Sequence, residues 1–294
     1  MKHIHIISPS GAIDNILIDN AITRLEQWGY TVTVAPHARG RNGRFAGTEQ
    51  ERLGDINDAL CLTDTDIILC SRGGYGLQQI ADHIRIPDLH VPLVVGFSDI
   101  TVLHSILGLH GLPTLHASMC KYIASLPDTH PALHLLQRAL QGEKMTYSIH
   151  PHALQRTGEG EGTLIGGNLS VLYGLQGTPY SLNCLIDNCE TPPILFIEDV
   201  CERHYHIDRM LQNLRMSGVL ARLGGMVIGQ FTDCEDDPLM GCTIHDTVMK
   251  AVSEYRFPVM MNFPAGHVER NVPLRLNVRW RLSVSSDRAQ LTEL

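Results

Sequence analysis

Short apolar runs alternate with amphipathic stretches along most of the chain. Runs such as HIHIIS and DIILC have the length of buried strands, and the stretches between them repeat apolar residues at helical spacing. This alternation predicts an α/β fold built on parallel sheets. The predicted strands are 3–8, 31–36, 66–70, 91–95, 163–168, 193–199, 224–231, 258–261 and 274–284, and the predicted helices are 14–28, 47–60, 101–110, one beginning at 168, 204–216 and 243–255.

The periodic pattern weakens between about residues 125 and 162, which predicts a domain boundary there. The sequence GEGEG at 158–162 is typical of an exposed linker. We therefore expect an N-terminal α/β domain at 1–150 and a C-terminal α/β domain at 151–294, and 294 residues are enough for two cores. Thr48 and Glu51 predict a capping box at the start of the helix 47–60.

Charge and hydropathy exclude several classes of partner. The chain has 23 Lys+Arg against 31 Asp+Glu, a formal net charge of −8, and only 5% aromatic residues. Without a basic run it has no electrostatic footprint for nucleic acid or an anionic membrane. The run IHII near the start is too short for the apolar region of a secretory leader, and without an apolar stretch of about 18 residues we expect no membrane-spanning helix. Eight irregularly spaced cysteines without a CxxC pair predict reduced, buried thiols in a cytoplasmic protein.

The segment VPLVVGFSD places Ser98 directly after a buried strand and before a helix. Open α/β sheets bind ligands at the carboxyl ends of their strands. Ser98 at this turn is therefore a candidate nucleophile, although the second glycine of GxSxG is missing. The alternative is that Ser98, with Asp99, only caps the helix.

A second strand end carries the sequence SRGGYG. Gly73 and Gly74 would let the backbone approach a ligand and present N–H groups to an anion or an oxyanion. The segment is not a Walker A motif, and a double glycine after a strand is also typical of a simple tight turn.

In the second half of the chain an acid and a histidine also follow strands. Glu198 and Asp199 end the run ILFIED, where acids serve either as helix caps or as site residues. His267 follows a Pro-Ala-Gly turn. The chain order Ser, Glu, His is one of several that assemble a catalytic triad. The group Cys201, His204 and His206 lacks a second ligand pair at zinc spacing, so we expect no metal.

Read together, eight segments resemble the LD-carboxypeptidases, also called muramoyltetrapeptide carboxypeptidases. They occur in the family's order from about residue 4 to 278, which is more specific than any one of them. The segments are ISPSGA, RFAGTEQERLGDIN, SRGGYG, GFSDIT, GTLIGGNLSVL, LFIEDV, GGMVIGQFTDC and Gly266-His267 followed by an asparagine.

The resemblance implies a cytoplasmic serine peptidase of peptidoglycan recycling that needs no cofactor. Such an enzyme removes the terminal D-Ala from the murein tetrapeptide by cutting the bond between meso-diaminopimelate and D-Ala. The family pairs an N-terminal α/β domain with a C-terminal domain of swivelling type, places the active site in the cleft between them and usually forms a homodimer. Its nucleophile, acid and base correspond to Ser98, Glu198 and His267.

The remaining roles follow from what this chemistry needs. The oxyanion requires fixed donors, for which the Asp99 N–H and that of Gly73 or Gly74 are candidates. Arg72 is a candidate for reading the substrate carboxylate, and Asn168 in the GGN motif for contacting the peptide.

Two other functions stay open. One is a hydrolase of the same family that confers self-immunity by cleaving peptidyl-nucleotide antibiotics. The other is a non-catalytic sugar- or nucleotide-binding module in which Ser98 and His267 have no chemical role.

Overall fold

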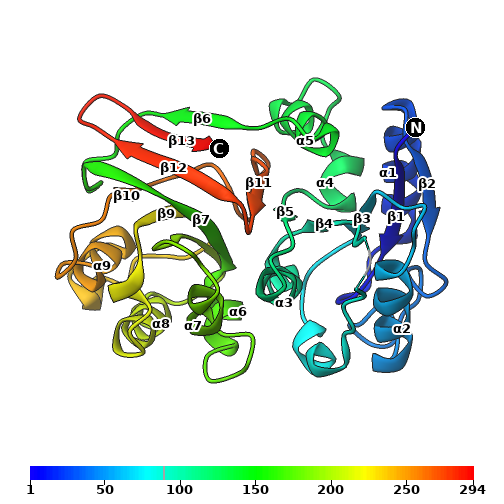
Figure 1. The fold of residues 1–294 in the computed structure, drawn as a ribbon, viewed down its shortest axis with the longest axis horizontal. Coiled ribbons are helices and arrows are strands. Elements are labelled where there is room, and N and C mark those ends of the chain that lie inside the picture. The colour runs from blue at the N-terminus through cyan, green and yellow to red at the C-terminus, as the bar shows by residue number, and fades with distance from the viewer. Residues whose placement is uncertain (89) are drawn as a thin grey trace. The chain divides into compact units, whose positions relative to one another are not determined.

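The computed structural model describes residues 1–88 and 90–294, which form two compact units (Figure 1). Unit 1 comprises Met1–Glu143 and Glu269–Leu274, and unit 2 comprises Lys144–Val268 and Arg275–Leu294. The division therefore comes earlier than the expected boundary at 150. The reason is that strand β6 (Thr146–Ile149) pairs with the last strand of the chain and so belongs to unit 2.

The sheet of unit 1 has the strand order β11-β5-β4-β3-β1-β2, and the division between the units falls within β11, after Leu274. Its strands β1 to β5 are parallel neighbours, and the fully buried apolar run of β3 is typical of a sheet covered on both faces. The strands are β1 (His3–Ile7), β2 (Thr31–Val34), β3 (Ile67–Cys70), β4 (Leu93–Gly96), β5 (Thr114–His116) and β11 (Leu274–Leu276), and the α-helices are α1 (Asn15–Gln27), α2 (Glu49–Leu60), α3 (Thr101–Leu109), α4 (Cys120–Ser125) and α5 (Pro131–Gln141).

Unit 2 is built on a seven-stranded mixed sheet in the order β10-β9-β8-β7-β12-β13-β6. The half from β10 to β7 is parallel and the half from β7 to β6 is antiparallel. Helix α8 packs against α6 and α9 beside the parallel half (Figure 1). The remaining bounds are β7 (Gly158–Asn168), β8 (Ile194–Val200), β9 (Gly225–Thr232), β10 (Val259–Met260), β12 (Arg279–Val284), β13 (Ala289–Glu293), α6 (Leu169–Gly174), α7 (Leu182–Asp187), α8 (His204–Met216) and α9 (Ile244–Ala251).

The GEGEG segment is not a linker, and that prediction was wrong. It forms the first half of β7, a central strand of the unit 2 sheet between β8 and β12. A Cβ atom at Gly160 or Gly162 would lie only 2.2 Å from a carbonyl oxygen of Gly224 or Pro192. On the alternate positions, Glu161 forms ion pairs with Arg279 and Arg281 of β12. The glycines therefore mark a strand face against which other backbone packs closely, not a flexible segment.

Other predictions had mixed outcomes. The helices at 14–28, 47–60 and 204–216 and the Thr48–Glu51 capping box are confirmed. The segment 274–284 is two strands, because Asn277 adopts a φ of 63° and breaks the extended backbone. The pattern did not reveal α4, α5, α7, β5, β6 or β13.

The structure also tests the predictions about the cysteines and about membrane-spanning helices. All eight cysteines are free thiols, but only Cys70 and Cys120 are buried, so the prediction of eight core thiols was wrong. Among the described residues, no helix combines the length and the apolar character needed to cross a bilayer.

The close approach at β7 gives the first prediction. Gly160→Ala should lower the free energy of unfolding by about 1–3 kcal/mol, because the new methyl group overlaps the Gly224 carbonyl. Chemical denaturation measures the change. Gly54→Ala, on α2 with open space around its Cβ position, is the control and should stabilise the protein by roughly 0.5–1 kcal/mol. A Gly160→Ala protein as stable as the wild type would contradict the close packing.

Candidate active site

Ser98 lies at a strained turn immediately after β4. It begins a 3-10 turn, Ser98–Ile100, that continues into α3, and its φ of 67° is in the left-handed region. Non-glycine residues in that region cost free energy and are held there by their surroundings. Neither the turn nor α3 has a side-chain cap hydrogen bond, so Ser98 does not act as a helix N-cap. The half-buried Ser98 therefore has the strained geometry expected of a nucleophile elbow.

Gly73 lies directly against Ser98. A Cβ atom at Gly73 would be 2.8 Å from the Cβ and 3.1 Å from the Oγ of Ser98, so no side chain fits there. The Gly73 carbonyl accepts a hydrogen bond from the Gly11 N–H at 3.1 Å. Gly74 has a φ of 112°, which L-residues rarely adopt. The structure thus brings the double glycine and the serine together, as expected of backbone that meets an oxyanion.

Two charged residues flank this turn. Arg72 is exposed, and its Nη1 donates to the Ala12 carbonyl at 2.9 Å. Asp99 is buried, and burial raises the pKa of its carboxyl group, while hydrogen bonds from Ser10 and Leu77 and the charge of Arg52 oppose that rise. The roles expected of Arg72 as a carboxylate reader and of the Asp99 N–H as an oxyanion donor stay predictions.

In unit 2, Glu198 and His267 are paired. The Nδ1 of His267 lies 2.8 Å from the Oε2 of Glu198, which is fully buried, whereas the His267 side chain is 18% exposed. A buried carboxylate at Nδ1 favours the tautomer in which Nδ1 carries the proton and Nε2 accepts one. This pairing is the one that a histidine acting as a general base makes with its carboxylate.

Two glycines shape the space around Glu198. A Cβ atom at Gly266 would lie 2.8 Å from the Glu198 Oε2, and one at Gly229 would lie 3.0 Å from the Glu198 Cβ. The pairing of β8 with β9 also shifts between Ile197 and Asp199, as at a β-bulge, a feature that redirects side chains. The carboxylate is held by close backbone on two sides.

Asp199 and Asn168 form a separate hydrogen-bond cluster. The Asp199 carboxylate accepts from the Asn168 Nδ2 at 2.9 Å and from the Ser170 N–H at 2.8 Å. The Asn168 Oδ1 in turn accepts from the Val171 N–H, so Asn168 is the N-cap of α6. Of the two acids ending β8, one pairs with the histidine and the other supports the start of a helix. Contact between Asn168 and a peptide stays a prediction.

Sequence reasoning assigned no role to Ser10 or Arg52, although both lie in quoted segments. The Ser10 Oγ donates to Asp99 at 2.6 Å, and the Arg52 side chain is 1% exposed. A signal was present for Arg52. It lies four residues before Ile56 and therefore on the buried face of α2.

The charged clusters give no sign of a metal centre. Across residues 1–88 and 90–294, no group of three or more His, Cys, Asp or Glu side chains is placed to hold a metal ion.

Family models match both halves of the chain. The model for the LD-carboxypeptidase N-terminal domain matches residues 4–117, and the model for the C-terminal domain matches residues 161–282. The fold together with these two matches defines the class, a peptidase of mixed α/β fold with two compact units. The chain belongs to the LD-carboxypeptidase family and is a carboxypeptidase.

Individual relatives agree with this assignment. A murein tetrapeptide carboxypeptidase of Pseudomonas aeruginosa is 30% identical over 90% of this chain and 88% of its own. A probable murein peptide carboxypeptidase of Bacillus subtilis is 29% identical, over 97% and 89%. The crystal structure of a muramoyltetrapeptide carboxypeptidase from Oxalobacter formigenes superposes with a TM-score of 0.84, at 27% identity, over 99% of this chain and 98% of that one.

A more distant likeness concerns the fold alone. The microcin C7 self immunity protein MccF has a TM-score of 0.83 at 18% identity, over 100% of this chain and 96% of that one.

Asp199 gives a prediction about pH. Burial, and next the charge of Glu198, raise the pKa of Asp199 from 3.8 to about 7. The folded protein therefore holds this proton more tightly than the unfolded chain, so stability is lost as the pH rises from 3.8 towards about 7. Relative to Asp199→Asn, the wild type should lose up to about 1 kcal/mol per pH unit between about pH 5 and 7.

Urea denaturation of both proteins across this range measures the difference. Asp233→Asn, at an exposed position of the same unit, is the control. Parallel stability curves for the wild type and Asp199→Asn would show that Asp199 does not titrate in this range.

Proposed function

We propose that the protein is a serine LD-carboxypeptidase that removes the terminal D-Ala from murein tetrapeptide. The observation that carries the proposal is the 2.8 Å pair between His267 Nδ1 and buried Glu198 Oε2, because it favours the tautomer in which Nε2 is the basic nitrogen that a serine needs. The relatives from Pseudomonas aeruginosa and Oxalobacter formigenes are a murein tetrapeptide carboxypeptidase and a muramoyltetrapeptide carboxypeptidase, which supports this substrate.

In this mechanism Ser98 and His267 exchange one proton. The Oγ of Ser98 attacks the carbonyl carbon of meso-diaminopimelate while Nε2 of His267 takes the hydroxyl proton. The carbon–nitrogen bond then breaks, and His267 returns the proton to the amine of the departing D-Ala. Water hydrolyses the acyl-enzyme by the same route in reverse. Glu198 stabilises the imidazolium formed in each half.

The oxyanion and the substrate carboxylate need donors from unit 1. The N–H groups of Asp99 and of Gly73 or Gly74 are the proposed oxyanion donors, a role supported by the contact between Gly73 and Ser98. Arg72 is proposed to read the C-terminal carboxylate because its guanidinium group is exposed beside this loop. The proposal requires that Nε2 of His267 reach the Oγ of Ser98 when substrate is bound.

Two further expectations belong to this proposal. The family resemblance implies a homodimer and a place in cytoplasmic peptidoglycan recycling. Sedimentation velocity and fractionation of the source cells test them separately.

The direct test is release of D-Ala from L-Ala-γ-D-Glu-meso-diaminopimelate-D-Ala. We expect turnover that EDTA does not change, and a loss of at least about 10³-fold in Ser98→Ala or His267→Ala. Glu198→Gln should also lose activity, because an amide does not stabilise the imidazolium. Folding of each variant is checked by circular dichroism. A folded wild type without D-Ala release, or an active Ser98→Ala, would refute the assignment.

Gly73 provides an independent test of the serine turn. Gly73→Ala should reduce kcat roughly 100-fold, because its methyl group displaces Ser98 and the neighbouring donors from the reacting carbonyl. Gly54→Ala is the control and should keep full activity. Steady-state kinetics on the tetrapeptide measure both, and an unchanged kcat in Gly73→Ala would argue against the role of this loop.

A second candidate function is hydrolysis of peptidyl nucleotides, and it is favoured by the fold shared with MccF. Aspartyl sulfamoyl adenosine, which is bound in one MccF complex, is a suitable probe of nucleotide binding. Comparing kcat/KM for the tetrapeptide and for a hydrolysable aspartyl nucleotide separates the two functions. We expect the tetrapeptide to be preferred.

A further inference from the structure

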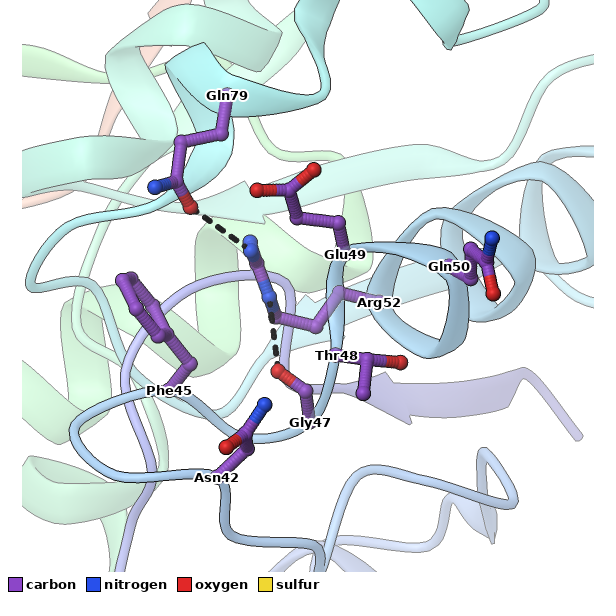
Figure 2. A pocket seen from close by; sticks show the side chains of 8 residues that line it. All are labelled: Asn42, Phe45, Gly47, Thr48, Glu49, Gln50, Arg52 and Gln79. Atoms are coloured by element: carbon purple, nitrogen blue, oxygen red, sulfur yellow. Dashed lines mark hydrogen bonds between the residues drawn. The ribbon is translucent and has the colours of Figure 1, made fainter.

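Arg52 is a buried cation at the inner face of α2. Its side chain is 1% exposed, and its guanidinium group donates to the carbonyl oxygens of Pro9 at 2.9 Å and Gly76 at 3.0 Å. It also donates to the Gln79 Oε1 at 3.0 Å, and it lies 4.9 Å from the centre of the Phe45 ring (Figure 2). Burying a guanidinium group is costly unless its N–H donors form hydrogen bonds, so these contacts fix the position of the Arg52 side chain.

Asp99 is the buried anion of the same region. Its side chain is 3% exposed, and its Oδ2 accepts from the Ser10 Oγ at 2.6 Å and from the Leu77 N–H at 3.0 Å. In sequence it directly follows Ser98. A displacement of Asp99 would therefore displace the serine.

One peptide group connects the two charges. The Gly76–Leu77 peptide offers its carbonyl oxygen to Arg52 and its N–H to Asp99. The peptide dipole is thus aligned between a cation and an anion, and hydrogen bonds in such a chain polarise one another. The neighbouring residues Pro9 and Ser10 make a second connection, with the Pro9 carbonyl on Arg52 and the Ser10 hydroxyl on Asp99.

Both connections end on the backbone that surrounds Ser98. The first holds the C-terminal end of the segment 73–76, whose Gly73 contacts Ser98. The second holds the segment that contains Gly11, and the Gly11 N–H donates to the Gly73 carbonyl. Gly76 has to be glycine, because its φ is 137° and a Cβ there would lie 2.8 Å from the Arg52 Nη1.

We propose that Arg52 and the Asp99 side chain are a pair of positioning residues that hold the 73–76 backbone against Ser98. They act through the Gly76–Leu77 peptide and through Pro9 and Ser10, and neither side chain has to touch the substrate. The proposal rests on the proposed function, in which Ser98 is the nucleophile and the adjacent glycine backbone binds the oxyanion.

The main test is Arg52→Lys. Lysine keeps the charge, but its single ammonium group does not reproduce the fork that reaches Pro9, Gly76 and Gln79 together. Because a misplacement of about 1 Å can cost about 100-fold in rate, kcat on the tetrapeptide should fall roughly 10- to 100-fold, with KM changed less than about threefold. The rate of Ser98 labelling by a fluorophosphonate should fall in parallel, while the labelled fraction at the end of the reaction stays complete.

The matched control is Arg24→Lys. Arg24 also donates to two carbonyl oxygens in unit 1, those of Ile123 and Leu126, but it contacts neither Asp99 nor the 73–76 segment in these hydrogen bonds. This variant should lose thermal stability without a change in kcat. Equal losses of kcat in the two arginine variants would reduce Arg52 to a general structural role and overturn the proposal.

A double-mutant cycle tests whether the two charges act as one unit. Arg52→Met and Asp99→Asn should each reduce kcat. The double variant should lose no more than the worse single variant, because each single variant leaves one buried charge uncompensated and the double variant leaves none. Independent, multiplying effects would overturn the coupling. If the Arg52 variants do not fold, Ser10→Ala is the deciding variant. Its kcat should fall roughly 3- to 10-fold, because one hydrogen bond to Asp99 is removed. An unchanged kcat in Ser10→Ala would refute the proposal.

Ser98→Ala separates the two levels of inference. If Ser98→Ala retains turnover, the proposed function itself is wrong. If Ser98→Ala is inactive while Arg52→Lys and Ser10→Ala keep the wild-type kcat, only the positioning role is wrong.

Discussion

A serine with a φ of 67° at the end of a buried strand is the constraint on which unit 1 depends. Such a backbone is unfavourable for a residue with a Cβ atom, so the surrounding structure has to hold it. Three features do so. Gly73 leaves room for the Ser98 side chain, Gly96 lets β4 approach the following helical turn, and buried Asp99 ties that turn to two other strand-end loops.

Unit 2 depends on a related constraint, which is that two carboxylates are buried at the end of one strand. Glu198 and Asp199 are neighbours on β8, where successive side chains point to opposite faces of the sheet. One face brings Glu198 to His267, and the other brings Asp199 to the first turn of α6. Because the two acids share a buried strand end, the charge of Glu198 adds to the cost of ionising Asp199, and hydrogen bonds from the Val200 N–H and from Asn168 offset part of that cost.

The same parts suit more than one substrate. A serine, an oriented histidine and backbone donors cleave acyl bonds in general, and the identity of the acyl and leaving groups is decided by other contacts. The family membership therefore defines the class of reaction more sharply than the substrate. Residues that contact the peptide beyond the reacting carbonyl are what separate a murein tetrapeptide from a peptidyl nucleotide.

The amino-acid pattern alone determined the α/β class, the capping box of α2, the strand ends that carry Ser98, Gly73, Glu198 and His267, and, through eight ordered segments, the family. These features follow from local periodicity and short motifs. The tertiary structure decided that GEGEG lies in a central strand, that Asp199 supports the start of α6 while Glu198 meets His267, and that Arg52 and Asp99 share one peptide group. These outcomes depend on which distant segment of the backbone packs against a given residue. The local spacing of side chains along the sequence does not encode such long-range contacts.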